Sequence, residues 1–269
     1  MDDILIPILV ASGVVAAVGL VVGIFLGISG KLLAVPTDEK AQAIREILPG
    51  NNCGGCGYSG CDGLAAAIVA GEAEVNACPV GGDDTARAIA GIMGVEAVDG
   101  KRMVAFVKCS GSCDKTEFKY EYFGVESCRM AALTPGKGSK SCPYACMGLG
   151  SCVAACPFDA IRVLRGRAEV IPELCRACGK CLAVCPTKII EFVPEDASYV
   201  VRCSSQDRGK NVRAVCAAGC IGCGICVKQC PEGAITLENN IAHIDQEKCT
   251  GCGACAAKCP AKVIVSHAM

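Results

Sequence analysis

One cysteine pattern occurs twice near the C-terminus, and it restricts the fold of this chain more than any other feature. Cys220-x2-Cys223-x2-Cys226-x3-Cys230-Pro is followed by a second run with the same spacing, Cys249-x2-Cys252-x2-Cys255-x3-Cys259-Pro. In such pairs of runs, three cysteines ligate one iron–sulfur cluster and the fourth ligates its neighbour. The pattern predicts a two-cluster module over residues 216–269.

The same pattern recurs 74 residues upstream. Eight cysteines match at that offset, which predicts two tandem modules of the bacterial two-cluster ferredoxin type, 142–194 and 216–269, with a linker over 195–215. The first module departs from the pattern once, because Leu149 stands at the position of Cys223. Cys142, one turn upstream of Cys146, is the natural substitute ligand. The matched cysteines are Cys142, Cys146, Cys152, Cys156, Cys175, Cys178, Cys181 and Cys185, which correspond to Cys216, Cys220, Cys226, Cys230, Cys249, Cys252, Cys255 and Cys259.

These spacings predict four cysteine sets that each bind a [4Fe–4S] cluster. In each set three ligands come from one run and one comes from the other. The predicted sets are Cys142, Cys146, Cys152 and Cys185; Cys156, Cys175, Cys178 and Cys181; Cys220, Cys223, Cys226 and Cys259; and Cys230, Cys249, Cys252 and Cys255.

A fifth set lies in a separate segment, which we expect to form a small helical domain over residues 31–95. Cys53, Cys56 and Cys61 lie in a glycine-rich loop, and Cys78-Pro follows an alanine-rich stretch predicted to be helical over 64–73. Glycine lets the backbone bend tightly and direct its amides at cluster sulfurs. The four cysteines predict a [4Fe–4S] site. Residues 55–60 also match G-x-G-x-x-G, but no strand precedes them, so a dinucleotide site is not expected.

Five cysteines remain outside these sets: Cys109, Cys113, Cys128, Cys203 and Cys216. Three of them lie in a connecting segment, 96–141, in which residues 102–108 are predicted to form a strand. The phrases around Cys109 and Cys203 are similar, Val-Lys-Cys-Ser and Val-Arg-Cys-Ser. The five can supply a sixth cluster or can pack as buried thiols. We favour buried thiols and expect five [4Fe–4S] clusters, with six as the alternative.

Composition agrees with clusters rather than with other uses of cysteine. The chain has 25 cysteines, no tryptophan and 4% aromatic residues, so metal centres are expected to replace a large conventional core. A disulfide framework or separated zinc pairs would not give triplets with a distant fourth ligand. A net charge of −1 gives no basic field for nucleic acid. The chain contains neither a phosphate-binding loop nor a flavin fingerprint, so no nucleotide is expected on it.

Residues 4–30 contain no charged side chain, and such a run is long enough to cross a hydrocarbon layer of ~30 Å. The start Met-Asp-Asp differs from the basic start of a signal peptide. We therefore expect a retained transmembrane helix over residues 1–30, with the C-terminal domains in the reducing cytoplasm. Gly19, Gly23 and Gly27 fall on one helix face, and small residues at this spacing favour a partner helix.

The motifs together resemble a known family. The segments CGGCGYSGCDGLAAAIVAGEAEVNACPVGG (53–82) and CPYACMGLGSCVAACPFDAI (142–161), with the membrane helix and the later cysteine run, look like the long form of the B subunit of the Rnf complex. The resemblance implies an α+β chain in a membrane-bound ferredoxin:NAD oxidoreductase that transports Na+ or H+. It implies a redox subunit that is not catalytic alone. The implied partners are soluble reduced ferredoxin as donor and the other membrane and peripheral subunits, which hold the flavins and the NAD site.

Two other functions remain open from the residues. A membrane-tethered polyferredoxin would supply electrons to a soluble reductase without ion pumping. A scaffold would use its clusters only for structure. Reversible reduction of the clusters separates the scaffold from the other two, and copurifying membrane subunits separate the pumping complex from the tethered carrier.

Overall fold

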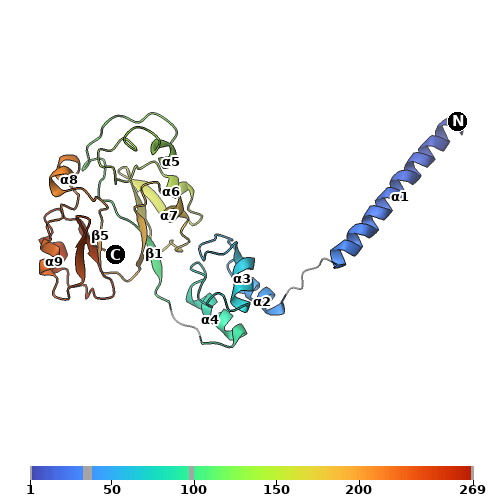
Figure 1. Ribbon diagram of the computed structural model, residues 1–269, viewed down its shortest axis with the longest axis horizontal. Helices are drawn as coiled ribbons and strands as arrows, with labels where there is room; N and C mark the ends of the chain where they lie inside the picture. The colour runs from blue at the N-terminus through green and yellow to red at the C-terminus, as the bar shows by residue number, and fades with distance from the viewer. Residues whose placement is uncertain (1, 33–37, 97–99, 268–269) are drawn as a thin grey trace.

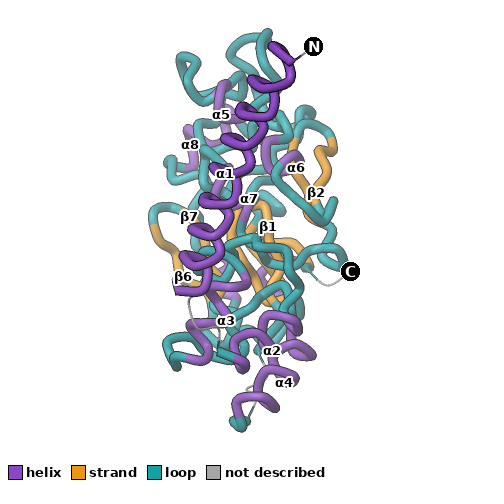
Figure 2. Tube along the Cα trace, turned by 90° about the vertical axis from the view of Figure 1, so that its right-hand side faces the viewer, coloured by secondary structure: helices purple, strands orange, loops and turns teal. Residues whose placement is uncertain are grey.

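A computed structural model describes residues 2–32, 38–96 and 100–267. Along the chain, these residues form one long helix, a small helical domain and two modules of short helices and strands (Figures 1 and 2). Every strand pairs antiparallel with one other strand, in four two-stranded sheets. This arrangement is the expected α+β class, with no large sheet among the described residues.

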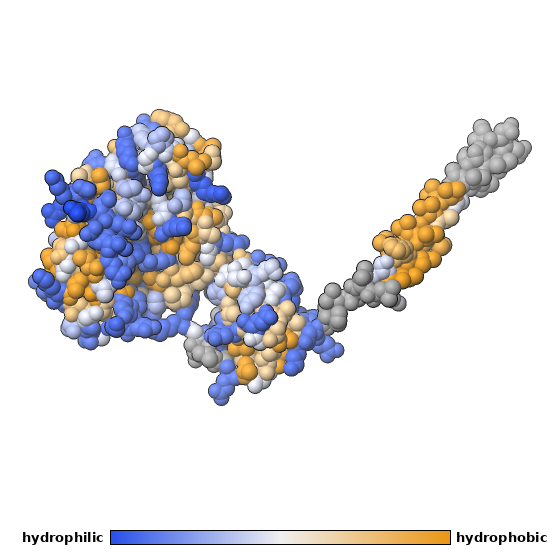
Figure 3. Space-filling model, viewed as in Figure 1, coloured by the Kyte–Doolittle hydropathy of each residue, from blue (hydrophilic) through white to orange (hydrophobic). Residues whose placement is uncertain are grey.

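Helix α1, Asp2–Leu32, is the apolar segment. Its residues Ser12–Ser29 contain the most apolar stretch, and none of that stretch is buried by the rest of the chain. In Figure 3 the visible face of the part of α1 that is coloured by hydropathy is mostly hydrophobic. A helix that is apolar all round needs a partner other than water, which agrees with the expected membrane segment.

The small helical domain contains α2 (Glu39–Ile47), α3 (Cys61–Val69) and α4 (Gly82–Met93). The Asp38 side chain caps α2 by accepting a hydrogen bond from the Lys40 amide at 2.8 Å. Ile44, Leu64 and Ile89 each come from one of these helices and are at most 1% exposed, so they form the core of the domain. The predicted helix 64–73 begins three residues earlier than expected, at Cys61.

The first module is framed by two strand pairs. Strand β1, at the predicted position 102–108, lies in the segment expected to be a connection, yet it pairs with β4 near the end of the module. Its side chains from Val104 to Val107 are buried. The module therefore begins about forty residues before Cys142, because the β1–β4 ladder joins this earlier segment to its end. The strands are β1 (Met103–Val107), β2 (Ile161–Leu164), β3 (Arg167–Val170) and β4 (Ile190–Pro194).

The second module repeats this plan. Strand β5 lies in the stretch expected to be a linker and pairs with β8, while β6 pairs with β7. The hairpin β6–β7 turns at Asn239 and Asn240, both with positive φ (47° and 64°), as a type I′ turn requires. The strands are β5 (Tyr199–Val201), β6 (Ile235–Glu238), β7 (Ile241–Ile244) and β8 (Ile264–Ser266).

Short helices position the cysteine loops in both modules. α7 and α9 follow the glycines Gly179 and Gly224, whose left-handed φ values are 77° and 68°. Gly150 holds the same conformation before α6 (φ 73°), so the loop at Leu149 keeps the shape of a ligand loop although it has lost the thiol. The helices are α5 (Cys128–Ala131), α6 (Ser151–Ala154), α7 (Lys180–Val184), α8 (Gly209–Val215), α9 (Ile225–Gln229) and α10 (Ala254–Lys258).

The two modules contact one another directly. The Phe106 ring lies edge-on to His267, with centroids 5.7 Å apart, and the Arg202 guanidinium lies 5.4 Å from the Phe106 centroid. Glu117 donates its amide to Val215 O at 3.0 Å, and Ala217 donates to Lys115 O at 2.8 Å. Backbone pairing across the junction fixes the modules relative to one another.

Candidate metal centres

Two predicted cysteine sets surround cavities of similar size. Site 3 lies in the first module and site 4 in the second, and both are small cavities. In each case the four predicted cysteines line the cavity together with mostly apolar side chains. Site 3 is lined by Cys156, Cys175, Cys178 and Cys181, and site 4 by Cys220, Cys223, Cys226 and Cys259.

Two further predicted sets are also brought together. At site 5 (Cys230, Cys249, Cys252, Cys255), burial raises the pKa of the Cys255 thiol, and charge on Cys249 and Cys252 adds to the rise. Cys230 packs against the same apolar core. At site 1 (Cys53, Cys56, Cys61, Cys78), burial raises the pKa of Cys78, and charge on Cys56 and Cys61 contributes. The Asn52 side chain fixes this loop by accepting a hydrogen bond from the Cys61 amide at 2.8 Å.

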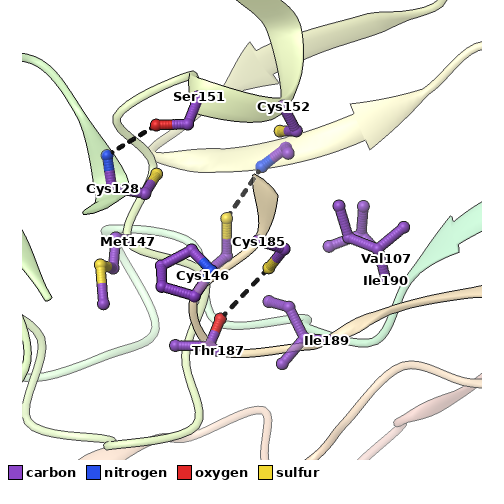
Figure 4. A pocket seen from close by; sticks show the side chains of 12 residues that line it. Val107, Cys128, Cys146, Met147, Ser151, Cys152, Cys185, Thr187, Ile189 and Ile190 are labelled. Atoms are coloured by element: carbon purple, nitrogen blue, oxygen red, sulfur yellow. Dashed lines mark hydrogen bonds between the residues drawn. The ribbon is translucent and has the colours of Figure 1, made fainter. Parts of the chain in front are cut away.

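Site 2 differs from the predicted set. A small cavity is lined by Cys146, Cys152 and Cys185, which belong to the predicted set, but its fourth thiol is Cys128 (Figure 4). Cys128 begins α5, and its amide donates to Ser151 Oγ at 2.8 Å, which ties this segment to the start of α6. The inserted segment before Cys142 thus supplies the thiol that Leu149 lacks. Cys142, the expected substitute, does not line this cavity.

Cys142 lies instead in a fourth cavity between the modules, which we call site 6. This small cavity is lined by four cysteines, and the spacing patterns leave all but one of them unassigned. They form two pairs of counterparts, because Cys109 and Cys203 share a local phrase and Cys142 and Cys216 match in the repeat. That double correspondence is visible in the sequence and is the signal that could have found the site. The four are Cys109, Cys142, Cys203 and Cys216.

The donor chemistry fits clusters at these sites. All 25 cysteines lie in the described part of the chain, and none is in a disulfide. Among the described residues, no three Cys, His, Asp or Glu side chains lie close enough to hold one ion, whereas four thiols around a zinc ion would each lie ~2.3 Å from it. A cavity lined by four thiols suits a [4Fe–4S] cluster, because each thiolate binds its own iron. Of the five unassigned cysteines, only the exposed Cys113 lines none of these cavities.

Burial makes these thiols weak acids in the protein without its clusters. It raises the pKa of Cys142, Cys152 and Cys181 to about 12 and that of Cys226 to about 11. At Cys142, charge on Cys109, Cys203 and Cys216 adds to the rise in pKa. Such thiols ionise when iron replaces the proton, so loading of the sites releases protons.

Backbone amides connect neighbouring sites. The Cys146 amide of site 2 donates to Cys109 Sγ of site 6 at 3.4 Å. The counterpart contact on the other side joins the Cys220 amide of site 4 to Cys203 Sγ of site 6 at 3.3 Å. Two site 6 sulfurs therefore each accept a hydrogen bond from the amide of a cysteine in an adjacent site.

The first module also approaches the small helical domain. Charge on Cys53 of site 1 and on Cys156 of site 3 contributes to the raised pKa of Cys178, of which burial is the main cause. A Cβ on Gly55 would lie 2.8 Å from Cys178 O, so glycine is needed where the two chain segments meet. Sites 1 and 3 are neighbours.

Comparison with known proteins identifies the family. Residues 48–80 match a family described as a putative Fe–S cluster, 142–196 match the LdpA Fe–S cluster-binding domain, and 174–235 and 219–263 match 4Fe–4S dicluster domains. The B subunit of the Na(+)-translocating ferredoxin:NAD(+) oxidoreductase complex of Acetobacterium woodii is 47% identical over 90% of this chain and 72% of its own length. This chain belongs to the B-subunit family of ion-translocating oxidoreductase complexes.

Two other members of the family match similar shares of the chain. The B subunit of the ion-translocating oxidoreductase complex of Methanosarcina acetivorans is 43% identical over 87% of this chain and 89% of its own length. The B subunit of the proton-translocating ferredoxin:NAD(+) oxidoreductase complex of Clostridium ljungdahlii is 38% identical over 87% of this chain and 82% of its own length. The resemblance to the Rnf B subunit in the sequence motifs is thereby confirmed, and the chain holds several [4Fe–4S] domains.

The placement of Cys128 predicts that a cysteine at position 149, where the second module has Cys223, can replace it as a ligand. Cys128→Ala is expected to remove one cluster, about four iron atoms per chain. Adding Leu149→Cys restores the ligand of the unbroken repeat on a loop that already has the right shape, so iron content should return. Iron analysis of anaerobically purified chains measures both steps. Full iron content in Cys128→Ala alone would contradict the assignment.

The separation of sites 2 and 6 predicts additive losses. Cys128→Ala and Cys142→Ala should each remove one cluster, and the double variant should remove two, about eight iron atoms. If the two cysteines served the same cluster, the double variant would lose no more than either single variant. Cys113→Ala is the matched control, because its exposed thiol lines none of the cavities.

Proposed function

We propose that this chain is the electron-transfer subunit of a membrane-bound, ion-translocating ferredoxin:NAD oxidoreductase complex and conducts electrons through six [4Fe–4S] clusters. The observation that carries the proposal is the continuous series of four-thiol sites, joined by the paired contacts of site 6. The clusters supply reversible one-electron transfer when bound. The chain supplies thiolates, amide donors to sulfur and an apolar lining that excludes water.

The contacts favour one order of sites: 5, 4, 6, 2, 3 and 1. Sites 4 and 5 share the second module, in which each cysteine run lends one ligand to the other site. Site 6 lies between sites 4 and 2 through the Cys220 and Cys146 amides. Charge on Cys181 of site 3 affects the pKa of Cys152 of site 2, and charge on Cys53 of site 1 affects that of Cys178 of site 3. This order joins the far module to the domain next to the membrane helix.

Exposure favours electron input at the second module. Cys223 of site 4 and Cys252 of site 5 are exposed, so a soluble protein can approach these ligands. The counterpart of Cys252 in the first module is Cys178, which is half-buried beside Gly55 of the helical domain. Reduced ferredoxin is therefore the proposed donor at the second module, and site 1 passes electrons to the membrane subunits.

The remaining chemistry is assigned to other subunits. The one G-x-G-x-x-G match, residues 55–60, lies in the cysteine loop of site 1, and no strand precedes it among the described residues; the sequence contains no phosphate-binding loop or flavin fingerprint. We propose that the chain is a redox subunit without catalytic activity of its own. Helix α1 spans the membrane, and the cluster domains lie in the cytoplasm, where thiolates stay reduced.

A membrane-tethered polyferredoxin that serves a soluble reductase is the second candidate. The exposed cysteines of the second module serve either function equally well. Family membership and the glycine face of α1 favour the complex. Copurification of further membrane proteins with the tagged chain separates the two, because a tethered carrier would purify alone.

The proposed order predicts that site 6 is an obligatory step. In the otherwise intact complex, Cys203→Ala is expected to remove one cluster and slow electron transfer from reduced ferredoxin to NAD at least about tenfold, since the two modules lose their link. Cys113→Ala should keep the normal rate. Stopped-flow reduction of the clusters measures the effect directly. A normal rate with site 6 empty would show that electrons bypass it.

The glycine face of α1 predicts a helix partner. No atom of this chain lies within 4 Å of a Cβ built on Gly23, so Gly23→Leu does not disturb the chain itself. In the complex the larger side chain should block close helix packing and reduce copurification of membrane subunits several-fold, with iron content unchanged. Val21→Leu, on another face, is the control. Equal recovery of subunits from both variants would contradict a helix contact at this face.

A further inference from the structure

Lys140 is the most deeply buried cationic side chain in the described part of the protein, with 4% of its surface exposed. Its ammonium group donates to Gly111 O and to Gly166 O, both at 2.7 Å. The other buried cation, Arg167, is 8% exposed and forms an ion pair with Glu169. Lys140 has no carboxylate among the ion pairs of the described residues, so its charge is balanced only by two carbonyl dipoles.

The two acceptors place Lys140 between sites 6 and 2. A Cβ on Gly111 would lie 3.5 Å from Cys109 Sγ and 3.6 Å from Cys216 Sγ, so the first acceptor residue lies against two sulfurs of site 6. The second acceptor, Gly166, is two residues from Ala168, whose amide donates to Cys146 Sγ of site 2 at 3.3 Å. One cation thus borders both cysteine sets.

The electrostatics agree with this position. Burial raises the pKa of both Cys146 and Cys216, and the positive charge of Lys140 acts in the opposite direction at each thiol. An ammonium group is costly to bury unless negative charge balances it. Four thiolates and their cluster carry net negative charge, which grows by one unit when the cluster is reduced. The missing counter-charge of Lys140 is therefore supplied when sites 6 and 2 are loaded.

We propose that Lys140 is the shared counter-cation of sites 6 and 2 and raises the reduction potential of both. A cation in a low-dielectric interior stabilises the reduced, more negative cluster more than the oxidised one. Electrons crossing from the second module to the first are thereby held at the junction rather than returned to site 4. The inference rests on the proposed function, because it requires clusters at both sites.

The test removes the positive charge of Lys140 and keeps a hydrogen-bond donor at this position. Lys140→Gln still has an amide NH2 for the carbonyl acceptors but carries no charge. Lys137→Met is the matched control, since Lys137 is an exposed lysine of the same segment. Potentiometric titration followed by EPR gives the midpoint of each signal. The signals of sites 2 and 6 are assigned by their loss in Cys128→Ala and Cys203→Ala.

In Lys140→Gln we expect the midpoints of sites 2 and 6 to fall by at least a tenfold change in the reduction equilibrium, about 59 mV for one electron. The midpoint potentials of the other sites in Lys140→Gln, and of all sites in Lys137→Met, should be unchanged. Unchanged midpoints at full iron content would overturn the inference, and so would an equal shift at every site.

A second variant, Lys140→Arg, keeps the test decisive if Lys140→Gln loses its clusters. If Lys140→Gln fails to hold iron at these sites, Lys140→Arg is measured in the same way, because it keeps the charge. Restored loading by Arg supports the counter-cation role, whereas loss in both variants overturns it in favour of a purely structural lysine. A wild-type chain without reversibly reducible clusters would instead reject the proposed function itself.

Discussion

The convergence of four thiols on one cavity is the constraint on which the rest of this structure depends. The chain has few large side chains to bury, and its cysteines lie inside the apolar cores of both modules. Thiol sets join segments that are far apart in the sequence, most widely at site 6, where Cys109 and Cys216 line the same cavity. Clusters that close such long loops remove much of the conformational freedom of the unfolded chain. Folding and cluster loading are therefore coupled, and the strands serve mainly to hold the cysteine loops in register.

The two modules are repeats, and their one irregularity has a structural explanation. In the second module, Cys223 completes site 4 from within its own run, while its counterpart Leu149 cannot ligate. The segment between β1 and Cys142 provides Cys128 in its place, anchored through Ser151 Oγ. Cys128 lines the cavity of site 2, whereas Cys142 lines that of site 6 together with Cys216. The substitution of one ligand and the presence of a sixth site are thus two aspects of the same rearrangement.

The sequence predicted those parts of the structure that depend on local spacing. The cysteines of sites 3 and 4 line common cavities as predicted, and the strand at 102–108 is confirmed as β1. Cys142 was predicted to share a site with Cys146 because the two are close in the sequence, whereas in the structure it lines the cavity between the modules. Local spacing carries no signal for a thiol that comes from a distant segment. The strands β1 and β5 were assigned to connections, since their partners β4 and β8 lie tens of residues away. Non-local pairing leaves no periodic signal in either strand.

The cysteine sites differ in how the negative charge of their thiolates can be balanced. Water can solvate the charge at the second module, where Cys223 and Cys252 are exposed, whereas Cys109 and Cys203 of site 6 are buried between the modules. There the protein must provide positive charge itself, and Lys140, Arg167 and Arg202 all lie at this junction. Arg167 is paired with Glu169, and Arg202 lies over the Phe106 ring, so the positive charge of each arginine is already partly balanced by these contacts. Lys140 forms no such contact among the described residues, so its positive charge is the one most available at this junction to offset negative charge on the surrounding cysteines.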